Sequence, residues 1–155
     1  MAIQRKISVR DSHVHGKGVF ALVDIPKGAR IIEYKGQRIT WAQALKRHPH
    51  DPKNPNHTFF FDIDEDMVID GGHRGNSARW INHSCHPNCK SEQVTVRGRQ
   101  RVFIHAKRNI RTGEELFYDY GLVIDAKLTK KLRKAYKCLC GTRYCRGTLL
   151  AQRKD

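Results

Sequence analysis

Short apolar runs rich in β-branched residues recur along the chain, and glycine, proline, asparagine or aspartate bounds most of them. Runs of this length and composition are typical of short β-strands. They cover residues 18–25, 29–34, 57–63, 67–70, 93–96 and 101–106. The last two runs flank Arg97, Gly98 and Arg99, which predicts a β-hairpin that turns at those residues. The pattern therefore predicts a mainly β protein built from several small sheets.

Two segments have helical rather than strand character. In the first, Thr40 can cap the N-terminus, and Trp41 and Ala44 have the spacing of one helix face. A second helix is expected at about residues 125–136. Three prolines within residues 48–57 predict an exposed loop after the first helix. Short helices are thus expected beside the sheets.

The length and charge of the chain limit its class. A chain of 155 residues suits one domain. No apolar run approaches the about 20 residues that cross a bilayer, and residues 1–10 lack the apolar region of a secretion signal, so we expect an intracellular protein without a membrane span. Thirty Lys and Arg against 15 Asp and Glu give a net charge of +15. Such a balance favours nucleic acid or another anionic partner, unless it serves only solubility.

The C-terminal cysteines form a C-x-C-x4-C pattern at Cys138, Cys140 and Cys145. Three thiolates this close suit tetrahedral zinc, with Zn–S distances of about 2.3 Å. Clustered thiols in a reducing compartment more often hold metal than form disulfides, although buried apolar cysteines are the alternative. Zinc needs a fourth ligand, and the remaining cysteines are Cys85 and Cys89. Histidines rank below the cysteines as ligands.

Four segments occur in an order that resembles one family. They are HVHGKGVFA (13–21), RWINHSCHPNC (79–89), GEELFYDYG (113–121) and CLCGTRYCRG (138–147). Together they resemble the SET-domain protein lysine methyltransferases with a C-terminal post-SET zinc-binding loop. The resemblance runs over nearly the whole chain, and the ordered combination of motifs is highly specific.

The resemblance implies a β-clip fold of small curved sheets with short helices. In that fold the segments at residues 82–85 and 114–120 pass through one another in a knot-like crossing, which is unusual because chains rarely thread. It also implies a division of the chain into a SET domain, a linker helix and a post-SET zinc-binding segment. These cover residues 1–124, 125–136 and 137–155.

The implied activity is transfer of a methyl group from S-adenosylmethionine to the ε-amine of a lysine in a protein. The family's catalytic tyrosine falls on Tyr120, and its lysine channel includes Tyr34 and Tyr118. The cofactor contacts fall on His15, Lys17, Gly18, Arg79, Trp80, Asn82 and His83, with Leu139 over the adenine. The zinc ligands fall on Cys85, Cys138, Cys140 and Cys145, whereas Cys89 matches a cysteine that is usually not a ligand.

The chemistry is consistent with these residues. A lysine must be neutral to attack, and with a pKa near 10.4 its deprotonation at pH 7 costs roughly 4.6 kcal/mol. An aromatic channel desolvates the ammonium group and the sulfonium of the donor repels it, so both lower that cost without a general base. In the family, tyrosine at the position of Tyr118 goes with monomethylation and phenylalanine with further methylation. We therefore expect mainly monomethyllysine as product.

The substrate is expected to be a histone tail or another basic protein associated with nucleic acid. The acidic segment at residues 62–70 could receive basic side chains, and the basic surface could contact nucleic acid. The protein would work in the cytoplasm if bacterial, and in the nucleus or on chromatin if eukaryotic or a pathogen effector. The main rival is a non-catalytic SET-fold module that binds chromatin or nucleic acid. A cysteine hydrolase that uses Cys85 with His83 or His86 is disfavoured, because neighbours in one short segment seldom point at each other.

Overall fold

The computed structural model describes residues 6–12, 14, 16–47, 60–63, 66–119, 142–143 and 145. The described elements, in chain order, are β1 (Ile7–Asp11), β2 (Lys17–Ala21), β3 (Arg30–Glu33), β4 (Gln37–Thr40), α1 (Trp41–Arg47), β5 (Phe60–Asp62), β6 (Met67–Asp70), the 3-10 helix η1 (Ser77–Trp80), β7 (Asn82–His83), β8 (Cys89–Val96), β9 (Arg99–Ala106) and β10 (Phe117–Tyr118). Among these residues, no helix has the length and apolar character that a membrane span requires.

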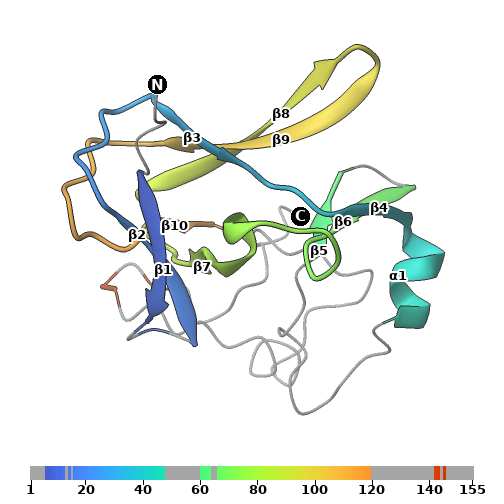
Figure 1. The fold of residues 1–155 in the computed structure, drawn as a ribbon, viewed down its shortest axis with the longest axis horizontal. Coiled ribbons are helices and arrows are strands. Elements are labelled where there is room, and N and C mark those ends of the chain that lie inside the picture. Colours follow the sequence, from blue (N-terminus) through green and yellow to red (C-terminus); the bar gives the residue numbers. More distant parts are fainter. Residues whose placement is uncertain are drawn as a thin grey trace.

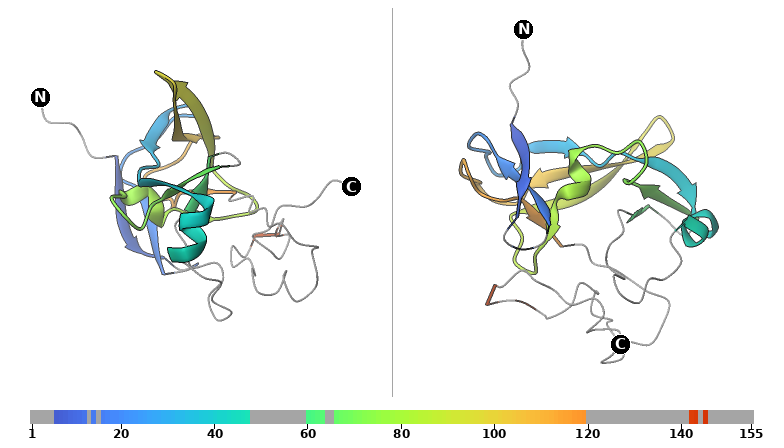
Figure 2. Two further views of the ribbon diagram at one scale, coloured as in Figure 1. Left: turned by 90° about the vertical axis from the view of Figure 1, so that its right-hand side faces the viewer. Right: turned by 60° about the horizontal axis from the view of Figure 1, so that its bottom comes forward.

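Within this described part, the strands form four small sheets (Figure 1). Their strand orders are β1-β2, β3-β9-β8, β4-β6-β5 and β10-β7. The β1-β2 pair lies at one end of the molecule, and α1 with β4 lies at the other (Figures 1 and 2). The prediction of a mainly β fold with several small sheets and short helices is therefore confirmed.

The longest pairing is the predicted hairpin of β8 and β9. It runs from Cys89 opposite Ala106 to Val96 opposite Arg99. Arg97 and Gly98 form the two-residue turn, with φ values of 51° and 76°. Positive φ at both turn residues matches the right-handed twist of the strands, and the turn residues themselves were predicted.

Helix α1 begins with the cap that its sequence predicted. The Thr40 hydroxyl accepts from the Gln43 N–H at 3.1 Å, and the Thr40 N–H donates to Gln43 Oε1 at 2.9 Å. This reciprocal pair satisfies two backbone donors that a helix start otherwise leaves open. Ala44 then packs with Ile39 and Val68 in a small core between α1, β4 and β6.

The main core holds the functional segments in place. Its fully buried members include Ile69 of β6, Ile104 of β9 and Ile110. Two others, Ile81 and Leu116, directly precede β7 and β10. Burial of one such side chain contributes about 1.5–3 kcal/mol, so each short strand begins from a residue that is fixed in the core.

Candidate active site

Strands β7 and β10 bring two distant motifs side by side. They pair in parallel, with Phe117 opposite Asn82 and Tyr118 opposite His83. The Ser84 N–H extends the contact by donating to the Tyr118 carbonyl at 3.3 Å. The N-H-S-C motif and the F-Y-D-Y motif therefore meet, as the resemblance implied, through the first residues of each.

Asn88 fixes the contact between the two motifs, a role that no sequence pattern indicated. Its side-chain Nδ2 donates to the Glu115 carbonyl at 2.8 Å, and its Oδ1 accepts from the Phe117 N–H at 2.9 Å. The Asn88 side chain thus bonds the backbone of residues 115–117 in the way that a neighbouring strand would. The backbone carbonyl of Asn88 accepts from the Lys107 N–H at 2.8 Å. Asn88 is 3% exposed, so these hydrogen bonds form in the interior.

His83 lies between a thiol and a carboxylate. Its Nε2 is 3.4 Å from Cys85 Sγ, and its Nδ1 is 3.6 Å from Asp119 Oδ1. The expectation that His83 and Cys85 would not point at each other was wrong. The chain bends at Cys85 and His86, where the His86 N–H donates to Ser84 Oγ at 3.0 Å, and the bend turns Cys85 back toward the histidine.

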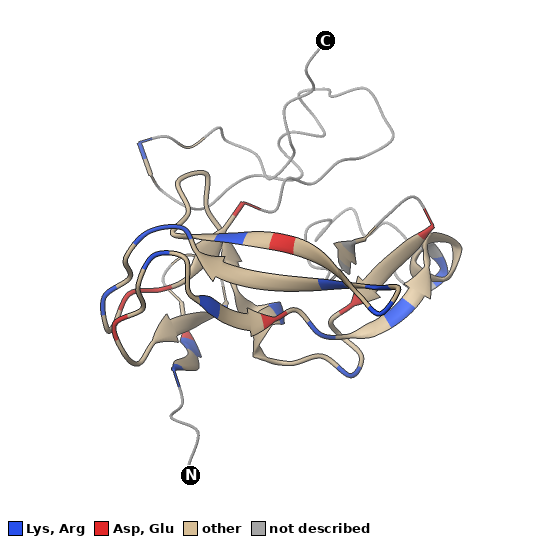
Figure 3. Ribbon diagram, turned by 90° about the horizontal axis from the view of Figure 1, so that it is seen from above, with Lys and Arg blue, Asp and Glu red and all other residues tan. Residues whose placement is uncertain are grey.

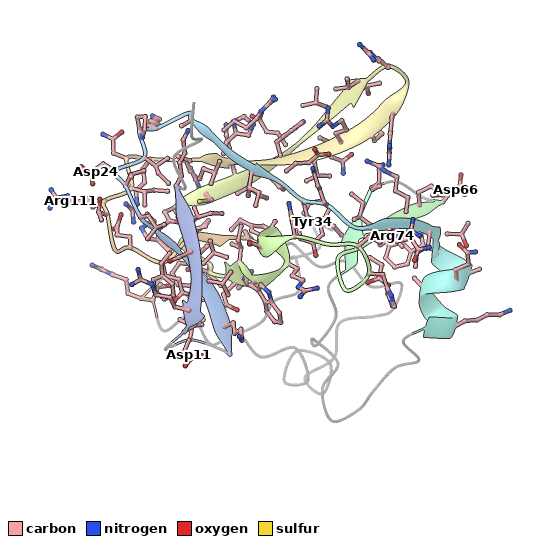
Figure 4. All side chains as sticks on the ribbon, viewed as in Figure 1. Asp11, Asp24, Tyr34, Asp66, Arg74 and Arg111 are labelled. Carbon is pink, nitrogen blue, oxygen red and sulfur yellow. The ribbon has the colours of Figure 1, made fainter. Side chains whose placement is uncertain are left out.

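Three aromatic rings form a row that ends at Tyr118, the residue that pairs with His83. The Tyr34 and Phe61 ring centroids are 5.2 Å apart, and those of Phe61 and Tyr118 are 6.2 Å apart. Tyr34 lies in the middle of the molecule (Figure 4). Burial, and then the charge of Asp70, raise the pKa of the Tyr34 hydroxyl, which therefore stays protonated. Phe61 joins the two predicted tyrosines, and the run of three phenylalanines did not show which ring would do so.

The predicted cofactor residues of the first motif lie next to Asn82. The Asn82 Nδ2 donates to the Lys17 carbonyl at 3.0 Å and to Glu115 Oε2 at 3.0 Å. The Lys17 residue is exposed, and Gly18 follows it in β2. The structure therefore brings Lys17, Gly18, Asn82 and His83 together. His15, Leu139 and Tyr120 lie outside the described residues.

Arg79 and Trp80 end the 3-10 helix just before β7. The Arg79 guanidinium lies 4.8 Å from the Trp80 ring centroid, and its Nη1 donates to the Gly71 carbonyl at 3.5 Å. Asn76 caps this helix by accepting from the Ala78 N–H at 3.2 Å. The same asparagine donates to the Glu33 carbonyl at 2.9 Å, which ties the helix to β3.

Asp70, the last acidic residue of the segment at residues 62–70, is buried. Asp70 is 1% exposed, and its Oδ1 accepts from the Gly72 N–H at 2.9 Å. Its other oxygen is 3.7 Å from His73 Nε2. Asp70 therefore stabilises the turn after β6 and belongs to no surface that could receive basic side chains. Asp66 is exposed, while Asp64 and Glu65 lie outside the described residues.

The thiols differ in their fitness to hold zinc. Cys89 is 1% exposed, and burial raises the pKa of its thiol to about 12, which disfavours the thiolate form that zinc binds. Cys85 and Cys145 are only half-buried, which suits metal ligands. No group of three possible ligands occurs among the residues that the structure describes, and Cys138 and Cys140 lie outside them.

Comparison with known proteins agrees with this arrangement. The SET domain family model matches residues 16–121. Histone-lysine N-methyltransferase SETD1B of Homo sapiens is 36% identical over 148 residues, which cover 94% of this chain and 7% of that protein. Histone-lysine N-methyltransferase trithorax of Drosophila virilis is 39% identical over 144 residues, covering 92% of this chain and 4% of that protein. The chain thus spans less than a tenth of these two relatives.

A solved structure described as "ctPRC2 in an autoinhibited conformation bound to S-adenosylmethionine" is also similar. Its TM-score is 0.71 at 29% sequence identity, and the match covers 77% of this chain and 15% of that one. The sheets, the paired motifs and these matches lead to one conclusion: the chain belongs to the SET domain family.

Proposed function

We propose that this chain transfers a methyl group from S-adenosylmethionine to the ε-amine of a lysine in a protein. The observation that carries the proposal is the row of Tyr34, Phe61 and Tyr118, which ends where β10 pairs with β7. Support also comes from relatives that are named histone-lysine N-methyltransferases and from a similar structure bound to S-adenosylmethionine.

The chain's residues suit that reaction. S-adenosylmethionine, when bound, supplies an electrophilic methyl group. Apolar ring faces disfavour the charged form of a lysine that lies against them, so its pKa falls toward the working pH. Tyr34 and Tyr118 are 4% and 7% exposed, so a lysine that reached them would be shielded from water. Positioning of amine and methyl group then contributes much of the rate, without a charged general base.

The remaining assignments are proposals of the same kind. Tyr120 is the catalytic tyrosine, and His15 and Leu139 complete the cofactor site. Cys85, Cys138, Cys140 and Cys145 hold a structural zinc ion. Residues 1–124 form the SET domain, 125–136 a linker helix and 137–155 the zinc-binding segment. The half-buried positions of Cys85 and Cys145 support the ligand set.

A histone lysine is the proposed substrate, and chromatin in a eukaryotic nucleus the proposed place of action. The names of the relatives support both. Contact with nucleic acid stays a prediction. Lys and Arg are spread over several loops and strands, with Asp and Glu between them (Figure 3). This distribution does not single out one surface for nucleic acid.

Methyl transfer tests the proposal directly. Purified full chain with zinc and isotope-labelled S-adenosylmethionine should label core histones. Asn82→Ala should lower kcat/KM roughly 10- to 100-fold, since it removes a buried polar group next to the proposed cofactor site. The matched control is Asn109→Ala, because Asn109 is exposed and its side chain accepts from the exposed Lys27 N–H. Binding of nucleosomes with no labelled protein would favour the non-catalytic rival.

Tyr118→Phe tests the expected product. The wild-type chain should form mainly monomethyllysine, and the variant should form di- and trimethyllysine, since loss of the hydroxyl leaves more room around the amine. Mass spectrometry of a histone peptide over a time course measures the distribution. Trimethyllysine as the main product of the wild-type chain would contradict the assignment of Tyr118.

A further inference from the structure

The carboxylate of Glu115 lies at the junction of two motifs. Its Oε1 and Oε2 accept from the Ser12 hydroxyl at 2.8 and 2.9 Å, and its Oε2 also accepts from Asn82 Nδ2 at 3.0 Å. Its backbone is held as well, because the Glu115 carbonyl accepts from Asn88 Nδ2 and the residue forms a bridge with Phe20 of β2. The position of the side chain is therefore well determined.

Gly18 makes room for this carboxylate. A Cβ atom at Gly18 would lie 2.4 Å from Glu115 Oε2, 2.8 Å from its Cδ and 3.1 Å from Ser12 Cβ. A side chain at this position would displace the Glu115 carboxylate. The glycine at this position thus serves the packing of Glu115 against β2, which adds to the expectation that it lets a cofactor approach the backbone.

The contacts of Asn82 fix the orientation of its amide. An amide group has donors on nitrogen and acceptors on oxygen, and the two ends are told apart by their partners. Both nitrogen partners here, the Lys17 carbonyl and the Glu115 carboxylate, can only accept. The nitrogen must therefore face them, and the carbonyl oxygen Oδ1 must face the opposite way.

We propose that Glu115 is a positioning residue that orients the Asn82 amide, so that its oxygen accepts from the amino group of bound S-adenosylmethionine. This inference rests on the proposed function. Without an acceptor at Glu115, only the Lys17 carbonyl would hold the Asn82 nitrogen. The amide could then rotate by half a turn more readily and present its nitrogen to an ammonium group, which would repel it. Ser12 supports the orientation by donating to the carboxylate.

The test measures binding of two ligands by calorimetry, using the full chain with zinc. S-adenosylhomocysteine carries the amino group, whereas 5′-methylthioadenosine lacks the whole amino-acid part. Glu115→Leu should weaken S-adenosylhomocysteine roughly 10- to 100-fold and change methylthioadenosine less than about threefold. Glu115→Gln, which keeps an acceptor, should bind S-adenosylhomocysteine within about threefold of the wild-type chain.

Ser12→Ala is a second variant in case Glu115→Leu does not fold, because Ser12 is only half-buried. It should weaken S-adenosylhomocysteine roughly threefold to tenfold, again without an effect on methylthioadenosine. Parallel losses for both ligands, no loss for either, or an equal loss in Glu115→Gln and Glu115→Leu would overturn the inference. A wild-type chain that binds neither ligand would instead overturn the proposed function and the inference with it.

Discussion

Asn88→Ala should lower the free energy of unfolding by about 3 kcal/mol and abolish most methyl transfer. The substitution leaves the Glu115 carbonyl and the Phe117 N–H without the side chain that bonds both. A buried polar group that loses its partner costs about 1–3 kcal/mol, and two groups are affected here. The loss falls on the segment that leads into β10, so the pairing of Tyr118 with His83 should weaken as well.

Urea denaturation followed by circular dichroism measures the change. Asn109→Ala is the matched control: it removes the same atoms from an exposed asparagine with one backbone contact, to the Lys27 N–H at 2.8 Å. That control should change stability by less than about 1 kcal/mol and leave activity intact. Equal stability of the two variants would show that Asn88 does not hold the two motifs together.

Cys85→Ser should remove zinc and with it most of the activity, while Cys89→Ala should keep both. Cys85 is half-buried, whereas Cys89 is buried in the core, where burial raises the pKa of its thiol. A structural zinc site needs four ligands, so loss of one should lower the content from about one ion per chain toward zero. Elemental analysis of the purified variants measures this directly.

The two variants should rank the other way in stability. Cys89→Ala should lose more stability than Cys85→Ser, although it keeps zinc and activity. Cys89→Ala removes a sulfur atom from the main core and should cost about 1–2 kcal/mol. Cys85→Ser changes a half-buried position and should leave the described sheets folded. Removal of zinc from the wild-type chain by a chelator should reproduce the Cys85→Ser result. Full zinc content in Cys85→Ser would exclude that cysteine from the site.

Features encoded by neighbouring residues could be predicted from the sequence. The turn at Arg97 and Gly98 and the cap formed by Thr40 and Gln43 each depend on a few consecutive residues. The strands β1 and β4 were not predicted. In the case of β4, the strand has one apolar residue, Ile39, and forms because it pairs with β6.

The contacts within the site depend on segments far apart in the sequence. The resemblance to a known family indicated that Asn82 and Tyr118 belong to one site, but no local pattern assigns Asn88 to a backbone carbonyl 27 residues away. Likewise, three successive phenylalanines cannot show which ring reaches Tyr34. Tertiary contact alone selects Phe61 and places Glu115 beside Gly18.

The β8-β9 hairpin connects the two halves of the site, and this has a use in engineering. Its base lies at Cys89 and Ala106, next to the paired motifs, while its tip at Arg97 and Gly98 is exposed. Exposed loop tips tolerate added residues well, whereas a change in length near the base would shift one motif against the other. A fluorophore or affinity tag would therefore be best inserted at the tip.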